Sequence, residues 1–167
     1  MPYRNKTYVA FDADSDIRYY RLMTAWKQSD NTDFDFYDAH NLTNIWQYST
    51  EETIKRSLKE RLKNTKIFVL LVGEKTKYLY KYVKWEIEQA IGLELPIIIV
   101  NLNGKRGIDY ANCPAILKDK LALHVSFNAK IIQKSLEDWE ELHKKYSTEM
   151  KSGPFHYNET VYKNLGL

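Results

Sequence analysis

Short apolar runs and amphipathic stretches alternate along this chain. The short runs are typical of β-strands, and the stretches between them repeat apolar residues every three or four positions, as amphipathic helices do. The runs that predict strands are residues 7–11, 34–37, 66–72, 96–101 and 121–126. The helical patterns begin near residues 17, 50, 78 and 129. This strand-then-helix order predicts an α/β protein.

Two of the predicted strands indicate how the sheet is built. Residues 66–72 and 96–101 are apolar almost throughout, which is typical of strands buried on both faces of a parallel sheet. We therefore predict a three-layer fold with an open, mainly parallel five-stranded sheet and helices on both faces. In such sheets ligands bind beyond the carboxyl ends of the strands, where the strand order reverses. Asp12, Asp38 and the helix predicted at 78–91 should lie there.

The helix predicted at 78–91 carries a carboxylate within its apolar stripe. On a helical wheel Glu86 falls among three apolar side chains, whereas Glu88 points elsewhere. The three are Leu79, Val83 and Ala90. Because burying an unpaired carboxylate is costly, Glu86 needs a partner, a raised pKa or a pocket open to a ligand. The simpler alternative is a helix-face glutamate that pairs with Lys or Arg, or that reaches water at the edge of the stripe.

Local signals predict where helices begin and end. Ser49 and Glu52 have the spacing of a capping box, which predicts the start of the second helix. Asn128 is placed to cap the last helix, and Gly92 is a candidate C-cap for the helix that carries Glu86.

The composition fits one globular domain. We expect this domain to span residues 1–150, followed by a C-terminal aromatic tail at 151–167. The net charge of +3 is modest, and basic and acidic residues are interleaved, so we expect neither nucleic acid nor a membrane as a partner. The chain has no apolar run long enough for a membrane helix, no secretory signal pattern and a lone Cys113. Together these features indicate a cytoplasmic protein.

Several motifs of nucleotide and metal chemistry are missing. No GxGxxG or GxxxxGK[ST] motif occurs, which argues against the usual dehydrogenases and NTPases. The spacing of Asp12, Asp14 and Asp16 resembles the start of a calcium loop, but the expected Gly and final Glu are absent. The histidines lack metal-ligand spacing and Cys113 lacks an activating neighbour, so we expect no metal and no cofactor.

Four segments carry a resemblance to a known family. They are residues 9–11 with the acidic turn after them, the loop that ends at Trp46, residues 62–73, and residues 82–87. Over most of residues 6–130 the chain resembles the TIR-like family of bacterial signalling proteins. It is most similar to the TIR-like subunit of Thoeris antiphage defence systems. The resemblance implies an open α/β fold of the TIR and flavodoxin-like type.

The resemblance also implies an activity. TIR enzymes carry their catalytic glutamate on the helix after the third strand, often in a Trp-x-x-x-Glu pattern. Here Tyr82-x-x-x-Glu86 stands at this place, with Tyr instead of Trp, which implies that Glu86 is catalytic. The implied reaction converts NAD to nicotinamide and a cyclic ADP-ribose-type signal that activates a separate effector protein. The residues expected to contact the substrate NAD are Phe11, Asp12, Asp38, Trp46 and Tyr82.

Two other classes of function stay open. TIR domains generally work by packing against each other, so we expect a homo-oligomer, and a non-catalytic TIR-like adaptor would act through the same self-association. An exposed Trp85, on the helix face opposite Ala90, would serve such an interface. A flavodoxin-like phosphoryl-transfer or nucleotide protein also fits the fold but lacks its motifs.

Overall fold

The strands of this protein form one six-stranded sheet. The structure is a computed structural model that describes residues 6–29, 34, 37, 38, 50–79 and 81–167, with only the backbone of residues 37 and 38. All neighbouring strands are parallel, in the order β2-β1-β3-β4-β5-β6. The strands are β1 (Lys6–Ala10), β2 (Tyr37–Asp38), β3 (Ile67–Val72), β4 (Ile97–Asn101), β5 (Ala122–Ser126) and β6 (Pro154–His156).

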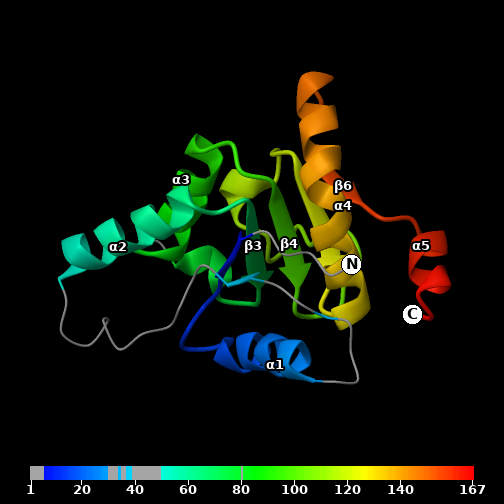
Figure 1. Ribbon diagram of the computed structural model, residues 1–167, viewed down its shortest axis with the longest axis horizontal. Coiled ribbons are helices and arrows are strands. Elements are labelled where there is room, and N and C mark those ends of the chain that lie inside the picture. The colour runs from blue at the N-terminus through cyan, green and yellow to red at the C-terminus, as the bar shows by residue number, and fades with distance from the viewer. Residues whose placement is uncertain (1–5, 30–33, 35–36, 39–49, 80) are drawn as a thin grey trace.

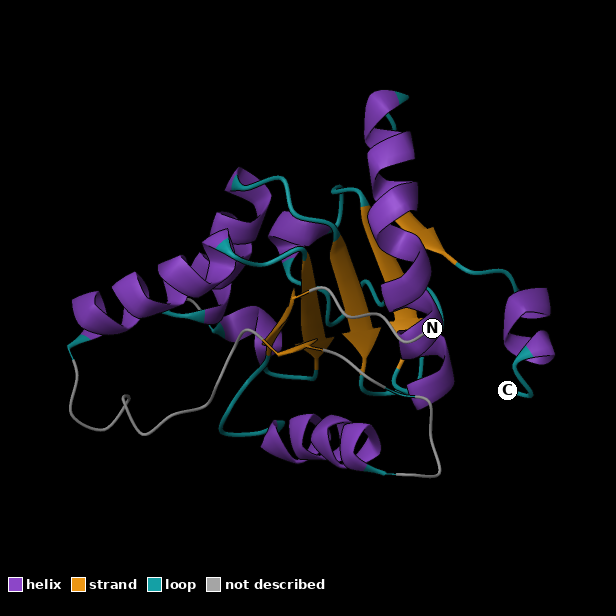
Figure 2. Ribbon diagram, viewed as in Figure 1, coloured by secondary structure: helices purple, strands orange, loops and turns teal. Residues whose placement is uncertain are grey.

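Helices cover both faces of this sheet. In Figure 1, α2 and α3 lie together at one side of the sheet and α4 lies at the other. Figure 2 shows the strands enclosed between the helices. Among the helices of the described residues, none is both long and apolar enough to cross a membrane. The α-helices are α1 (Ile17–Gln28), α2 (Glu51–Lys63), α3 (Val83–Gly92), α4 (Ala129–Thr148) and α5 (Glu159–Asn164), and the short 3-10 helices are η2 (Thr76–Tyr78) and η3 (Ala115–Leu117).

Alternating strand side chains build two hydrophobic cores, one on each face of the sheet. Tyr8 of β1 points into the core beneath α2 and α3, where it joins Ile87. Its neighbour Val9 points into the other core, together with Met23 of α1 and Trp139 of α4. Because successive strand residues point to opposite faces, β1, β3, β4 and β5 each contribute to both cores. The continuous apolar runs of the sequence follow from this double burial.

The predicted fold class is confirmed, with one strand more than expected. The additional strand, β6, comes from residues 151–167, which the sequence analysis treated as a tail. β6 pairs with β5, and Tyr162 of α5 is fully buried in the core that contains Trp139. The C-terminal residues are therefore part of the packed domain.

The helix expected over 78–91 is shorter in the structure. α3 begins at Val83 and η2 precedes it, so Leu79 lies outside the helix. The buried stripe of α3 includes Ile87, and Leu79 packs against the same core from outside the helix. Gly92 is the last helical residue rather than a cap, and the left-handed conformation falls on Glu94, whose φ is 54°.

Two other helix ends test the predicted caps. Asn128 caps α4 as predicted, since its side chain accepts a hydrogen bond from the N–H of Lys130. α2 is capped by Thr50, whose hydroxyl accepts from the N–H of Thr53. The predicted cap, Ser49, lies outside the described residues.

Candidate active site

Glu86 lies in the first turn of α3 with its side chain turned toward the sheet. It is only 3% exposed and shares the buried stripe with Val83, Ile87 and Ala90. Helical periodicity places these four residues on one face. Glu88, by contrast, is exposed, and its carboxylate lies 4.0 Å from the Lys84 ammonium group. The expected contrast between a buried Glu86 and a solvent-facing Glu88 is confirmed.

Tyr8 of β1 supplies a hydrogen bond to this buried carboxyl group. Its hydroxyl donates to the Glu86 carboxylate within the domain interior. The fully buried Tyr8 ring stacks on Phe68 of β3, with ring centroids 5.7 Å apart and planes inclined by 12°. Stacking between two central strands fixes the ring, so the hydroxyl approaches Glu86 from a rigid support. The sequence analysis missed Tyr8, and the available signal was a phenol in the middle of a short buried strand.

Burial governs the protonation of Glu86. Loss of hydration raises its pKa from 4.5 to about 7, and the Tyr8 hydrogen bond opposes this rise because it favours the carboxylate. The group therefore changes charge near neutral pH. Its burial also excludes the simpler alternative of a glutamate that reaches water at the edge of the stripe.

Phe11 lies apart from Glu86. It follows β1 on the opposite face of the sheet and belongs to the core beneath α1 and α4. Its ring stacks on Tyr20 of α1, with centroids 4.9 Å apart. Because Tyr8 and Phe11 are an odd number of residues apart, their side chains leave the strand in opposite directions. The structure therefore does not bring Phe11 to the candidate site.

Asp12 shapes the turn that follows β1. Its Oδ1 accepts hydrogen bonds from the backbone N–H groups of Asp14 and Ser15, at 3.0 and 3.3 Å. Its carbonyl oxygen accepts from the N–H of Asp16 at 2.8 Å. Aspartate commonly stabilises turns in this way. The observed contacts of Asp12 thus hold the loop at the carboxyl end of β1.

Of the other expected substrate contacts, Tyr82 lies near Glu86 in the chain, whereas the Asp38 side chain and Trp46 lie outside the described residues. Tyr82 directly precedes α3, and its carbonyl oxygen accepts the N–H of Glu86 at 2.7 Å. Its half-buried ring lies 5.3 Å from the Lys81 ammonium group. Asp38 ends β2 beside Thr7, but its side chain lies outside the described residues, as does all of Trp46.

Trp85 differs from the expectation of an exposed interface residue. It is half-buried, packs against the core beneath α2 and α3, and has the Lys55 ammonium group 5.6 Å from its ring centroid. The wheel placed Trp85 opposite Ala90 but could not show that α2 covers that flank of α3. The expected exposure of Trp85 was wrong.

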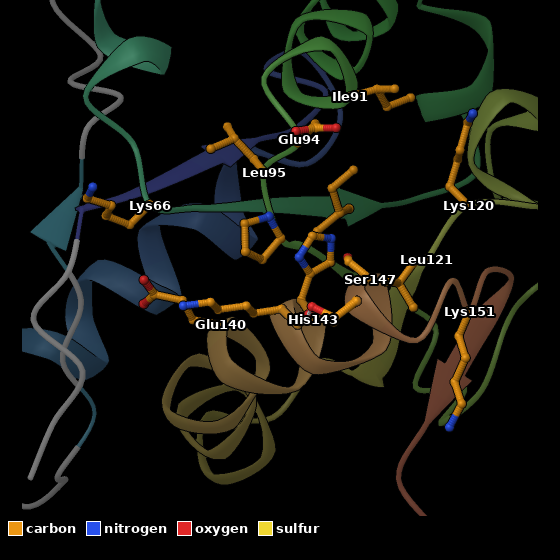
Figure 3. Close-up of a pocket in the computed structure, with 14 residues that line it drawn as sticks. Lys66, Ile91, Glu94, Leu95, Lys120, Leu121, Glu140, His143, Ser147 and Lys151 are labelled. Carbon is orange, nitrogen blue, oxygen red and sulfur yellow. Dashed lines mark hydrogen bonds between the residues drawn. The ribbon is translucent and has the colours of Figure 1, made fainter.

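A groove of about 620 Å³ opens at the other end of the sheet. It is lined by residues that directly precede or begin β3, β4 and β5, and by His143 and Ser147 of α4. Figure 3 shows Lys66, Lys120 and Lys151 at its rim, pointing away from one another. Because the basic groups diverge and the groove lies at the amino ends of the strands, it does not extend the Glu86 site.

Histidine and cysteine side chains do not add a metal centre to the described part of the chain. No group of three or more His, Cys, Asp or Glu residues gathers there in a way that could hold a metal ion. His124 is fully buried on β5, and burial lowers its pKa to about 4. Burial also raises the pKa of the Cys113 thiol to about 11, so it is not poised as a nucleophile.

Comparison with known proteins identifies the family. The family described as Thoeris protein ThsB, TIR-like domain, matches residues 8–107, more than half of the chain. The matched region runs from β1 past β4 and includes both Tyr8 and Glu86. Among curated proteins, none matches this chain. The chain belongs to the TIR-like domain family of the Thoeris protein ThsB, and its role is in Thoeris defence.

Proposed function

We propose that this protein cleaves NAD, with Glu86 as the catalytic residue. The observation that carries the proposal is a buried carboxyl group at the start of α3, held by the Tyr8 hydroxyl and with a pKa near 7. Perturbed acids of this kind cluster at functional sites. Membership in the TIR-like family supports the same residue, because a glutamate on the helix after the third strand is the acid that TIR enzymes use.

The proposed reaction breaks the bond between nicotinamide and ribose. The bonding electrons go to the pyridinium nitrogen, which becomes neutral, so the leaving group needs no proton. Positive charge develops on the ribose, as in an oxocarbenium ion. The Glu86 carboxylate would stabilise this charge electrostatically, in surroundings where little water weakens the attraction.

Glu86 must be ionised for this role. The Tyr8 hydrogen bond favours the carboxylate form. The positive pyridinium ring of NAD would favour it further, because a nearby opposite charge lowers the pKa of an acid. Substrate binding and ionisation of Glu86 therefore reinforce each other.

We also propose a cyclic ADP-ribose-type product that activates a separate effector protein. A nucleophilic atom of the same nucleotide would capture the ribosyl cation and lose its proton, whereas capture by water would give linear ADP-ribose. Exclusion of water favours the cyclic product, and Glu86 is among the buried polar residues of the domain. Tyr82, Asp38 and Trp46 are the proposed NAD contacts. Phe11 packs in the core beneath α1 and α4, and Asp12 stabilises the loop after β1.

The decisive experiment replaces Glu86 by Gln, which keeps the volume and the Tyr8 hydrogen bond but removes the charge. We expect a folded protein by circular dichroism whose release of nicotinamide from NAD falls at least about a hundredfold. The matched control is Glu88→Gln on the exposed face of the same helix, which should retain wild-type turnover. Wild-type turnover by folded Glu86→Gln protein would refute the catalytic assignment.

Mass spectrometry of the same reaction identifies the product. A cyclised product is lighter than linear ADP-ribose by one water. Linear ADP-ribose alone, with no activity transferable to an effector in the filtrate, would refute the signalling proposal and leave an NAD hydrolase. Light scattering during the assay tests the proposed homo-oligomer, which a strictly monomeric and fully active protein would contradict.

A further inference from the structure

The strand order places a crevice between β1 and β3. From β1 the chain moves outward to β2, and from β3 it moves the other way to β4 and β5. The turns that leave the carboxyl ends of β1 and β3 therefore separate to opposite faces of the sheet. In open α/β sheets this is the position where ligands bind.

The side chain of Asp16 lies in this crevice, and one of its carboxyl oxygens has no hydrogen-bond donor. It is 7% exposed, and its Oδ2 is buried with no hydrogen bond to any described residue. It stands at the N-cap of α1, yet its side chain makes no capping bond. A buried carboxyl oxygen without a donor is costly, so a structural role alone does not account for it.

Gly73, the residue directly after β3, is adapted to this carboxyl group. A Cβ atom at position 73 would lie 2.4 Å from Oδ2 and 2.9 Å from Oδ1 of Asp16. At such distances a side chain at this position would force the Asp16 carboxyl group to shift. The turns after β1 and β3 therefore pack closely against the carboxyl group of Asp16.

A groove of about 380 Å³ opens beside Asp16 at the same end of the sheet. Two cationic residues also line it, Arg18 from α1 and Lys75 from the turn after β3. Arg18 donates a hydrogen bond to the hydroxyl of Tyr19, whereas Lys75 forms no ion pair with any described residue. The polar lining is completed by Ser15, Glu74, Asn103 and Asn112.

The chemistry of this lining selects the class of ligand. The Asp16 carboxyl group accepts hydrogen bonds, so it favours a ligand with hydroxyl or amine donors. Arg18 and Lys75 attract an anionic group and oppose a bound metal ion, and the Glu74 carboxylate in the same lining partly offsets their charge. Burial, followed by the neighbouring Asp12 charge, raises the pKa of Asp16. A phosphorylated sugar offers hydroxyl donors and an anion in one small molecule. The groove lies near the small end of the range for ligand sites, which suits one such unit.

We propose that the groove between the β1 and β3 turns binds the ribose phosphate unit of a nucleotide. The Asp16 carboxyl accepts hydrogen bonds from the ribose hydroxyls, and Lys75 and Arg18 face the phosphate. The unit comes either from the adenylate half of NAD or from a separate nucleotide. The binding itself does not depend on cleavage of NAD.

The test titrates adenosine 5′-monophosphate into the full chain, followed by calorimetry or NMR. We expect saturable binding that Asp16→Asn weakens about tenfold to a hundredfold, the loss typical of a hydrogen bond to a charged group. Lys75→Ala should weaken binding most at low salt. The matched controls are Asp14→Asn in the same turn and Lys59→Ala on α2, both exposed and outside the groove, which should leave the affinity unchanged.

A nucleotide that lacks the ribose hydroxyls tests the same hydrogen bonds on the wild-type protein, so this test does not depend on whether a variant folds. The 2′,3′-dideoxy nucleotide should bind the wild-type protein about tenfold or more weakly, and Asp16→Asn should not weaken it further. Absence of saturable binding, equal affinity for the two probes, or equal losses in Asp16→Asn and Asp14→Asn would each overturn the proposal.

The Glu86→Gln variant separates this proposal from the catalytic one. It should bind the nucleotide like the wild type, and its turnover of NAD bears only on the proposed function. Competition on this variant then distinguishes the two sources of the ligand. Displacement of the nucleotide by NAD assigns the groove to the adenylate half of the substrate, and binding without displacement assigns it to a separate nucleotide.

Discussion

At the scale of single residues, burial gives a glutamate a higher pKa than a histidine, which is the reverse of their usual order. Burial raises the pKa of Glu86 from 4.5 to about 7 and lowers that of His124 from 6.5 to about 4. Both groups are therefore largely neutral in the folded protein at mildly acidic pH. Their effects on stability are opposite, since Glu86 disfavours the folded state as pH rises and His124 disfavours it as pH falls.

Replacing Glu86 by Gln should stabilise the folded protein above neutral pH. Between pH 4.5 and about 7 the folded protein holds a proton on Glu86 that the unfolded chain has released, so stability falls as pH rises through this window. At pH 8 the variant should exceed the wild type by about 3 kcal/mol in free energy of unfolding, and below pH 4.5 the gap should close. Urea unfolding of both proteins at the two pH values measures this, and a pH-independent gap would contradict it.

Replacing Tyr8 by Phe should shift the pH dependence of NAD turnover toward alkaline pH. The variant keeps the ring stacked on Phe68 but loses the hydrogen bond that favours the Glu86 carboxylate. The pKa of Glu86 then rises further, so a higher pH is needed to ionise it. The pH profile of kcat/KM checks the shift. A uniform loss of activity with an unchanged profile would indicate a purely structural role for Tyr8.

At the scale of elements, the turns after β1 and β3 pack together where the Asp16 carboxyl group lies against Gly73. Gly73 does not have a positive φ, so an alanine there is disfavoured by the Asp16 carboxyl group and not by its backbone conformation. Gly73→Ala should cost about 1–3 kcal/mol in the wild type and clearly less in an Asp16→Ala background. A double-mutant cycle by chemical denaturation measures the difference. Equal costs in both backgrounds would show that the two turns are not coupled.

At the scale of the whole molecule, the C-terminal residues complete the domain. Tyr162 of α5 is fully buried, its hydroxyl accepts the N–H of Ser126 at 3.3 Å, and Glu159 pairs with Arg106 at 2.6 Å. Deleting residues 154–167 would expose this part of the core. Tyr162→Ala alone should cost about 3–5 kcal/mol, whereas the exposed Lys163→Ala should cost little. Thermal melts of the two variants check this, and equal melting temperatures would contradict it.

The sequence predicted the parts of the fold that depend on local patterns. Five strands, the two sheet faces and the burial of Glu86 follow from periodicity within single elements. Tyr8 did not, because it meets Glu86 across 78 residues of sequence, and no local pattern connects them. The three residues of β6 are too few to show a period. The start of α3 was missed because η2 and a helix repeat apolar residues at nearly the same spacing.

The outermost strands of the sheet bear on how copies of this protein can assemble. β6, which forms one edge of the sheet, spans three residues, so it presents a short row of backbone groups to another molecule. Short edge strands disfavour the strand-by-strand addition that joins separate sheets into fibrils. Copies of this protein should therefore meet through helices and loops. Their complexes should not bind dyes specific for cross-β fibrils.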